Sequence, residues 1–236
     1  MTKKTPSNTF WKNVRIFILR TVVFLFSFSI LSVILLKWLP VRYTPLMFVR
    51  YVENIADGNY RNTREWVSID DISEDVIMAV IAAEDNKFME HFGIDLNAIK
   101  EAMKHNKENN TVRGGSTITQ QTAKNVYLLP SRTWSRKALE AYFSILMEIF
   151  WSKKRIMEVY LNVIEVGDGL YGIETAAKKY FRKSASELTG YEAAQIASIL
   201  PNPRKFKIDK PTTELKRKQT KIRSRMRGMK RPIKWE

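Results

Sequence analysis

The sequence of 236 residues contains no cysteine and only two histidines, His91 and His105. Without cysteine the chain has no disulfides, thiolate zinc sites or iron–sulfur clusters, and it has no cysteine nucleophile. The two histidines are well separated in the sequence, which argues against a histidine metal site. These absences exclude several kinds of metal and redox chemistry before any motif is considered.

Acidic residues are scarce at both ends of the chain. Residues 1–50 hold eight basic residues and no acidic one, and residues 204–236 hold fourteen basic and three acidic residues. The central range, 51–203, holds 18 basic and 21 acidic residues. The formal net charge of +16 therefore belongs to the two ends, which weakens the nucleic-acid interpretation that so basic a chain first suggests.

The N-terminal part has a long apolar run. Residues Thr21–Leu36 carry no charge, and the wider range 16–39 includes only Arg20 and Lys37. A helix of that wider range spans about 36 Å, enough for a bilayer core of about 30 Å. The basic residues before the run predict a cytoplasmic N-terminus (1–15), a transmembrane helix and the remaining chain outside. One alternative is a cleavable signal peptide, but no small-residue cleavage site follows the run. The other is a buried core helix, which is rarely apolar on every face in a protein this small.

The segment Thr44–Ile55 directly follows the predicted anchor and is rich in large apolar residues. Two interpretations stay open for it. It is either an ordinary helix at the start of the domain or a helix on the membrane surface, where a lipid substrate is met. We assign residues 40–67 to a membrane-proximal segment.

The rest of the chain has the apolar spacing and the capping residues of helices, and it has few runs of period two. Two positions fit capping boxes, in which the side chains of a cap residue and a residue three further on bond each other's backbone. The predicted N-caps and their capping-box partners are Ser73, Thr117 with Gln120, Ser152, and Thr189 with Glu192. We therefore expect a mainly α domain.

A candidate acid or base is Glu84. It lies four residues after Val80 and seven after Ile77, so it shares a helix face with apolar residues. Desolvation there, together with the neighbouring Asp85, favours the neutral acid, and such a carboxyl can act as a general acid or base near neutral pH. The competing interpretation is an exposed pair of acids at a helix end.

A candidate anion site begins at two glycines, 114 and 115. They are followed by Ser116 and Thr117 at a predicted helix start, where free backbone N–H groups and the helix dipole favour an anion. Lys124 lies two turns further along, and Arg132 and Arg136 follow in the next connection. This set suits a phosphate or a pyrophosphate. The competing interpretation is an ordinary helix cap that begins with glycine.

A second carboxylate, Glu140, lies beside the apolar stripe of its predicted helix, one turn after Arg136. Taken alone, the two residues are typical of an i,i+4 ion pair. Together with the other segments and the anchor, they indicate acid–base chemistry on a substrate with a phosphorylated leaving group at a membrane surface.

Four segments carry a resemblance to a known family. They are EDNKFMEHFGID, GGSTITQQTAKN, RKALE and KKRIMEVYLNVIEVGDGLYGIETAAKKYF. In this order they resemble the motifs of the peptidoglycan glycosyltransferases, which include monofunctional biosynthetic transglycosylases and the glycosyltransferase domains of bifunctional penicillin-binding proteins. The resemblance runs from about Ser68 to Phe206, so we expect this domain at 68–207 and a basic tail at 208–236. The penicillin-binding domain of the bifunctional proteins carries an S-x-x-K motif. No such motif occurs in this chain, which therefore resembles the monofunctional type.

The resemblance implies a fold and an activity. The expected fold is mainly α, with a lysozyme-like lobe and a smaller membrane-facing lobe, preceded by one transmembrane helix. The expected activity is polymerisation of lipid II into glycan strands, with release of undecaprenyl diphosphate. The expected location is the bacterial cytoplasmic (inner) membrane, which the chain crosses once, with the catalytic domain on the outer, periplasmic face.

The resemblance also implies residue roles. Glu84 matches the general base that acts on the acceptor sugar's 4-hydroxyl. Glu140 matches the family's second catalytic glutamate, which either assists the donor side or helps to organise cations there. Lys124, with Arg132, matches the cations that stabilise the diphosphate. The residues expected to bind substrate are Asp85, Ser116, Thr117, Gln120, Gln121, Lys124, Arg132 and Arg136.

No cofactor is expected to be required, and no dedicated metal-ligand set is readable; a divalent cation, Mg²⁺ or Mn²⁺, is compatible with assisting the diphosphate. The expected partners are lipid II, the growing lipid-linked glycan chain and membrane lipids, with other cell-wall synthesis and division proteins as further candidates and nucleic acid not among them.

One departure from the family pattern stands out. Arg182 occupies a position where family members often have glycine, so the turn there is an open question.

Two other functions compete with the transferase. The first is a lysozyme-like hydrolase of finished glycan, which two carboxylates would suit; the pyrophosphate-suited helix start argues against it. The second is a non-enzymatic basic binder of membrane or nucleic acid. We also hypothesise that the basic stretch Arg204–Lys234 contacts anionic headgroups or the diphosphate-bearing substrate.

Overall fold

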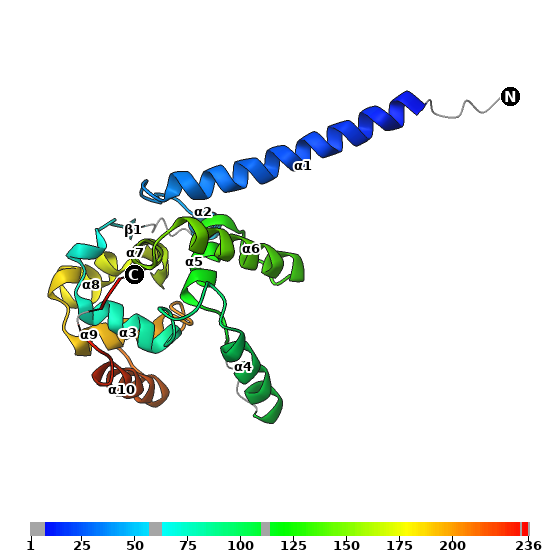
Figure 1. Ribbon diagram of the computed structural model, residues 1–236. Coiled ribbons are helices and arrows are strands. Elements are labelled where there is room, and N and C mark those ends of the chain that lie inside the picture. The colour runs from blue at the N-terminus through cyan, green and yellow to red at the C-terminus, as the bar shows by residue number, and fades with distance from the viewer. Residues whose placement is uncertain (1–7, 57–62, 110–113, 232, 236) are drawn as a thin grey trace. The chain divides into compact units, whose positions relative to one another are not determined.

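The computed structural model describes residues 8–56, 63–109, 114–231 and 233–235. By packing, the chain divides into two compact units, Met1–Leu39 and Pro40–Glu236 (Figure 1). The division coincides with the end of the predicted transmembrane range 16–39. Parts of the predicted segments 1–15 and 40–67 lie outside the described residues.

In its described residues the first unit contains one helix, α1 (Asn8–Leu36), which begins before the predicted range 16–39 and ends before Leu39. Within it, Phe10–Leu36 is long and apolar enough to cross a membrane, and its most apolar 18-residue stretch has a mean hydropathy of 2.3. The hydroxyls of Ser29 and Ser32 donate to backbone carbonyls one turn earlier, so neither leaves an unpaired polar group on the helix. The helix fits a single-pass membrane anchor.

The second unit is mainly α-helical, as predicted. Its helices are α2 (Pro45–Ala56), α3 (Glu74–Glu84), α4 (Leu96–Glu108), α5 (Ile118–Tyr127), α6 (Trp134–Phe150), α7 (Lys153–Val163), α8 (Ile173–Phe181), α9 (Gly190–Ile199) and α10 (Thr213–Arg227). Two single-turn 3₁₀ helices, η1 and η2, cover Ile69–Asp71 and Ala185–Glu187. The described strands form one small sheet in the order β1-β3-β2, with β1 (Thr63–Arg64) parallel to β3 (Leu170–Tyr171) and β2 (Glu165–Gly167) antiparallel to it.

Most predicted helix starts are confirmed. Both capping boxes form, and the Ser152 hydroxyl accepts the N–H of the third residue of α7. Ser73 does precede α3, but its side chain makes no capping hydrogen bond. Its backbone N–H instead donates to the carbonyl of Ala185 at 3.0 Å, which ties the start of α3 to η2.

The core lies around α3, α7 and α9. In α3 every residue from Val76 to Ala82 is buried, so this helix is surrounded by the rest of the unit. It packs against α9 and α10, while α5 packs against α6 and α7. The last residue of the buried α3 is Glu84, so the core positions that carboxyl at the end of a rigid helix.

The basic segment 208–236, which we expected as a tail beyond the domain, contributes a helix to it. Leu215, Gln219, Ile222 and Met226 are buried at spacings of four, three and four residues, and they face α3 and α9. The remaining positions of α10 are mostly lysine and arginine, which give the segment the composition of a solvated tail. Four inward-facing residues are nevertheless enough to dock the helix.

Arg182 ends α8 in the left-handed conformation, with φ 56° and ψ 37°. It is the only residue other than glycine with positive φ among the described residues. The turn that a family glycine would make without strain is therefore made here by arginine, at a conformational cost.

Candidate active site

Glu84 lies at the C-terminal end of α3 and lines a cleft of about 600 Å³. The cleft walls come from the loop after α3, the segment before α5, the start of α4, and α10. Burial raises the pKa of Glu84, a hydrogen bond from Gln121 and the charges of Lys218 and Lys124 lower it, and Asp85 raises it. The net shift is upward, as expected from its apolar helix face, so its carboxylate is more basic than an ordinary glutamate.

The neighbouring Asp85 is buried, and its carboxylate is directed to protein groups. It accepts the backbone N–H of Ile118 at 3.0 Å and contacts Nε2 of His91 at 2.9 Å. Ile118 is the first residue of α5, so Asp85 joins the loop after Glu84 to the start of that helix. This geometry assigns Asp85 a positioning role and leaves its expected part in substrate binding as a prediction.

The start of α5 is held by a compact set of hydrogen bonds. The Thr117 hydroxyl donates to the carbonyl of Gly93 at 2.6 Å and accepts the N–H of Gln120 at 3.1 Å. The side-chain oxygen of the buried Gln120 accepts a hydrogen bond from the N–H of Thr117. A side chain at Gly115 would place its Cβ 3.1 Å from the Cα of Ile99 in α4, so glycine allows the close approach there. Thr117 and Gln120 therefore shape the site by bonding each other.

Gln121 presents a fixed amide to Glu84. Its side-chain oxygen accepts the hydroxyl of Tyr160 at 3.2 Å, and its Nε2 donates to Oε2 of Glu84 at 2.8 Å. Because the tyrosine hydroxyl can donate to the oxygen, the amide nitrogen is directed at the carboxylate. Gln121 thus belongs to the immediate surroundings of Glu84.

Lys124 lies one turn after Gln121, and its ammonium has no hydrogen-bond or ion-pair partner among the described residues. Burial lowers its pKa, Glu140 and Glu84 raise it, and Arg136 and Lys137 lower it, with a net shift downward. The lysine therefore lies between two carboxylates and two other cations. It is the cation of this cluster whose charge is available to a ligand.

Glu140 is 2 % exposed, and its carboxylate forms ion pairs with two cations. Arg136 pairs with one carboxylate oxygen at 2.5 Å, and Lys137 pairs with the other. Lys137 also donates to the Ser116 hydroxyl at 3.1 Å, which connects α6 to the segment before α5. The i,i+4 pair expected from the sequence is present. Lys137 was missed by sequence reasoning, although its position three residues before Glu140 is the spacing of a second ion pair.

Arg132 is exposed, between α5 and α6, and makes no hydrogen bond or ion pair with any residue that the structure describes. The structure therefore does not bring it into the cluster formed by Lys124, Arg136 and Glu140. Its expected role toward a diphosphate stays a prediction.

Two residues of α10 complete the cleft beside Glu84, and sequence reasoning missed both. Lys218 lines the cleft; burial lowers its pKa and the charge of Glu84 raises it. The Arg225 guanidinium donates to the carbonyl of Ala82 at 2.8 Å, in the last turn of α3. The signal that predicts them is the apolar spacing within the basic C-terminal segment.

Comparison with known proteins identifies the family. A sequence model of the transglycosylase family matches residues 50–227. The chain belongs to the transglycosylase family. It is similar to the biosynthetic peptidoglycan transglycosylases of Bdellovibrio bacteriovorus (48 % identity over 217 residues, 92 % of this chain and 87 % of the relative) and of Bacteroides thetaiotaomicron (48 % over 202 residues, 85 % and 82 %). A relative of the same name from an Escherichia coli strain is 47 % identical over 221 residues, 92 % of this chain and 91 % of the relative.

The family assignment fits the structure. This transglycosylase is a glycosyltransferase of peptidoglycan synthesis, and its helical domain is of the lysozyme-like type expected from the motifs. The matched range ends at Arg227, the last residue of α10. The helix that carries Lys218 and Arg225 is therefore part of the family domain.

In the transglycosylase, a half-buried lysine holds the loop after α3 in place. Lys153 donates to the carbonyl of His91 and to Glu148, each at 2.7 Å, and lies 4.8 Å from the centre of the Phe88 ring. Thr119 of α5 donates to the same Glu148 oxygen at 2.7 Å. Loop, α5, α6 and α7 thus share one polar network, which fixes the distance between Glu84 and the start of α5.

No group of three or more metal-ligating side chains occurs among the described residues. Glu84 and Asp85 are adjacent, but Asp85 is taken up by the backbone of α5 and by His91. These residues therefore do not form a protein-only metal site. Whether the reaction needs a divalent cation is a separate question, and the expectation that it does not stays a prediction.

Proposed function

We propose that this transglycosylase polymerises lipid II, a lipid-linked disaccharide-pentapeptide, into glycan strands and releases undecaprenyl diphosphate, with Glu84 as general base. The observation that carries the proposal is the position of Glu84. Its carboxyl is largely desolvated, lines the cleft and accepts one fixed hydrogen bond, from Gln121. A base of raised pKa in such a place is suited to take a proton from a sugar hydroxyl.

The chemical step is a single displacement. Glu84 takes the proton of the acceptor's 4-hydroxyl, and that oxygen forms a bond to C1 of the donor sugar. The bond from C1 to the diphosphate oxygen breaks, and undecaprenyl diphosphate leaves with the electron pair. The anomeric centre is inverted, because the attack and the departure take place on opposite faces.

Positive charge near the leaving diphosphate would stabilise the negative charge that develops on it. The cations near α5 differ in whether they are already paired with a carboxylate. Arg136 and Lys137 are both paired with Glu140, whereas Lys124 has no such partner among the residues described. We assign Lys124 to the developing charge of the diphosphate. Glu140 then acts by holding Arg136 and Lys137 beside Ser116, since neither of its oxygens is free. Arg132 is a second candidate for the diphosphate.

A membrane-bound substrate requires the cleft to lie near the bilayer. In α2 the side chains of Phe48, Tyr51, Val52 and Ile55 are exposed, and in α6 Trp134 is 91 % exposed. Both helices pack against α5, and we treat their exposed apolar side chains as one region of the unit. We propose that this region contacts lipid, with α1 as the anchor in the bacterial inner membrane, the N-terminus cytoplasmic and the cleft outside. Of the two interpretations for Thr44–Ile55, the exposed side chains favour the membrane-surface helix.

The proposed reaction uses no resident cofactor. A Mg²⁺ or Mn²⁺ ion carried by the diphosphate remains compatible with it. The further partners proposed are the growing glycan chain and other proteins of cell-wall synthesis and division.

The deciding experiment supplies labelled lipid II to the purified full chain in detergent and measures polymer and released undecaprenyl diphosphate. We expect Glu84→Gln to lower the rate by about 10²–10⁴-fold, the contribution of a general base. Glu108→Gln, at an exposed end of α4, makes the same chemical change away from the cleft and should leave the rate unchanged. Polymer formation by Glu84→Gln at the wild-type rate would refute Glu84 as the base. Soluble fragments from finished peptidoglycan, without consumption of lipid II, would instead indicate a hydrolase.

A further inference from the structure

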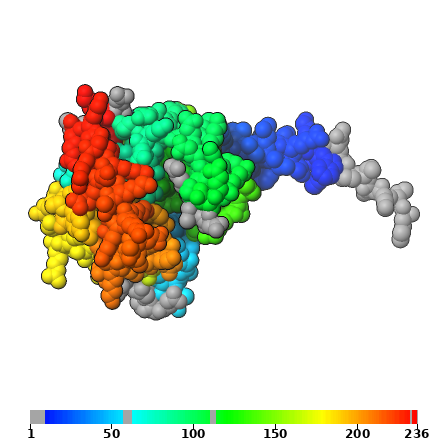
Figure 2. All heavy atoms as spheres, turned by 90° about the horizontal axis from the view of Figure 1, so that it is seen from below, coloured from blue at the N-terminus to red at the C-terminus, as the bar shows by residue number. Residues whose placement is uncertain are grey.

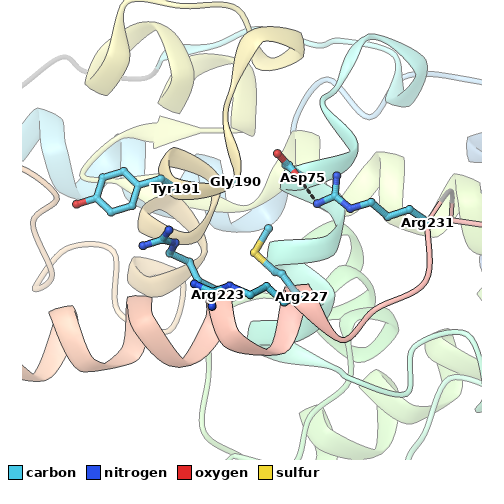
Figure 3. Close-up of a pocket in the computed structure, with 7 residues that line it drawn as sticks. Asp75, Gly190, Tyr191, Arg223, Arg227 and Arg231 are labelled. Atoms are coloured by element: carbon cyan, nitrogen blue, oxygen red, sulfur yellow. Dashed lines mark hydrogen bonds and ion pairs between the residues drawn. The ribbon is translucent and has the colours of Figure 1, made fainter.

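A second hollow, of about 320 Å³, lies on a different side of α10 from the Glu84 cleft. Figure 3 shows its main residues: Arg223 and Arg227 of α10, Arg231 just after the helix, Tyr191 at the start of α9 and Asp75 at the start of α3. No residue is shared between the linings of the two cavities. The hollow is therefore separate from the chemistry proposed above.

Positive charge in this hollow is incompletely neutralised. Arg231 pairs with Asp75, and Arg223 lies over the Tyr191 ring with its guanidinium carbon 5.1 Å from the ring centre. Among the residues that the structure describes, neither Arg223 nor Arg227 has an acidic partner. Three guanidinium groups therefore face one carboxylate, and two of them are available to an anion.

The surroundings of these arginines are held in place by the fold. Met226 is 5 % exposed and anchors α10 between Arg225 and Arg227. A Cβ at Gly190 would lie 3.2 Å from a carboxylate oxygen of Asp75, so α3 and α9 meet closely there. Beyond α10, the N–H of Ile233 donates to Glu74 at 2.5 Å and returns the chain to α3. A hollow with a fixed floor requires less ordering on binding than a mobile tail.

The hollow lies away from the apolar region assigned to the membrane. Within the second unit, α10 is at the far end from α2 and α6 (Figure 1). Figure 2, seen from below, shows the orange and red C-terminal residues spread over this face of the unit. With the apolar region on lipid, the hollow opens to the aqueous phase rather than to phosphate headgroups. Its anion is therefore one that a water-exposed molecule carries.

We propose that this hollow binds carboxylates of the peptides on peptidoglycan, the polymer that the cleft extends. The inference rests on the proposed function, because that function brings this polymer to the enzyme. A peptide ends in a carboxylate, and the planar guanidinium fork matches a carboxylate with two parallel hydrogen bonds. Many peptides on one strand offer many such groups, so weak single contacts add up along the polymer.

The test measures sedimentation of the full chain, in detergent, with purified insoluble peptidoglycan. We expect the double variant Arg223→Gln/Arg227→Gln to bind about fivefold more weakly, because two charge-assisted contacts are lost. The matched control is Arg217→Gln/Lys221→Gln, which removes the same charge from exposed positions of α10 that line neither cavity. We expect this control to bind like the wild type. Equal weakening in both double variants would refute a specific hollow and indicate diffuse attraction of a basic helix.

Two further measurements identify the ligand group. Peptidoglycan whose carboxyls have been converted to amides should bind the wild type about as weakly as native peptidoglycan binds Arg223→Gln/Arg227→Gln. Unchanged binding of the amidated polymer would overturn the proposal. Vesicles of phosphatidylglycerol test a lipid phosphate as the source of the anion; loss of vesicle binding in Arg223→Gln/Arg227→Gln alone, relative to the control, would also overturn it.

Failure of this inference is distinguishable from failure of the proposed function. Polymerisation of lipid II is measured for the same variants, and Arg223→Gln/Arg227→Gln should keep the wild-type initial rate. Glu84→Gln, in contrast, should lose polymerisation and keep peptidoglycan binding. If the hollow does not bind peptidoglycan, Glu84→Gln still loses polymerisation. If Glu84 is not the base, Arg223→Gln/Arg227→Gln still binds peptidoglycan more weakly than the wild type.

Discussion

Nε2 of Gln121 donates a hydrogen bond of 2.8 Å to Oε2 of Glu84. This bond lowers the pKa of Glu84, whereas burial raises it more strongly. The amide therefore keeps a desolvated carboxylate ionised over a wider pH range and fixes which lone pairs face the cleft. The same amide receives the hydroxyl of Tyr160, so α3, α5 and α7 meet at the proposed base.

Replacing Gln121 should change the pH dependence of the reaction. In Gln121→Leu the hydrogen bond is lost, the pKa of Glu84 rises further, and the base becomes protonated at a higher pH. The acid limb of kcat/KM for lipid II should shift to higher pH. Tyr160→Phe, which only loosens the amide, should shift the limb in the same direction by less. An acid limb that stays in place in Gln121→Leu would contradict this role.

Glu84→Gln should stabilise the folded protein at neutral pH. The folded-state pKa of Glu84 is raised above its unfolded value, so the folded state favours the protonated acid and the charge destabilises it once the pH exceeds both values. We expect the neutral amide to raise Tm by about 1–3 °C at pH 8. The gain should shrink as the pH falls below the unfolded-state value, where wild-type Glu84 is neutral in both states. Thermal unfolding at pH 8 and pH 4 measures this, and an equal gain at both would refute it.

Lys124→Met should lower kcat more than it changes KM. The ammonium is free of other partners in the described structure, and we assign it to charge that develops on the leaving diphosphate. Loss of such a group costs about 10²–10³-fold in kcat. Lys104→Met, at an exposed position of α4, is the matched control and should have no effect. A change confined to KM would indicate binding of ground-state substrate instead.

Glu140→Gln should destabilise the fold, because it leaves Arg136 and Lys137 without their buried counter-charge. We expect a loss of about 3 kcal/mol in the free energy of unfolding, as for other broken buried pairs. Urea denaturation of the single and double variants with Arg136→Met completes a double-mutant cycle. The double variant should be more stable than the sum of the two single effects predicts. Strictly additive losses would show that the pair is not coupled.

Arg182→Gly should stabilise the protein. Arg182 is held at φ 56°, where a side chain costs about 1–2 kcal/mol and glycine does not. We expect a gain of about 0.5–1 kcal/mol after the greater chain entropy of glycine is subtracted. Arg182→Ala removes the same charge and keeps the Cβ, so it should gain nothing. A gain of similar size in Arg182→Ala would assign the effect to charge and not to backbone strain.

Sequence reasoning reached those parts of the site that depend on local pattern. Glu84 was expected on an apolar helix face, and the capping box of Thr117 was read from spacing alone. Both were accessible because helix periodicity and capping act over a few residues. The pairing of Arg136 with Glu140 was accessible for the same reason.

Other parts of the site depend on contacts between distant segments. The expected substrate contact of Asp85 stays a prediction, but the engagement of its oxygens by the backbone of α5 and by His91 is visible only in the structure. Lys218 was assigned to a basic tail, yet it lies in the cleft with Glu84, because α10 docks on α3 and α9. Neither position follows from spacing along the chain.

The sequence by itself determined the anchor-like apolar run, the helical class, the family and the segments that hold the chemistry, because these depend on composition, periodicity and ordered motifs. Only the tertiary structure decided which charges are free and which are occupied. Glu140 is neutralised by Arg136 and Lys137, Lys124 has no such partner in the described structure, and the basic C-terminal residues form one wall of the cleft. The physical reason is that burial and pairing set what a charge can do, and both arise from packing between helices that are far apart in the chain.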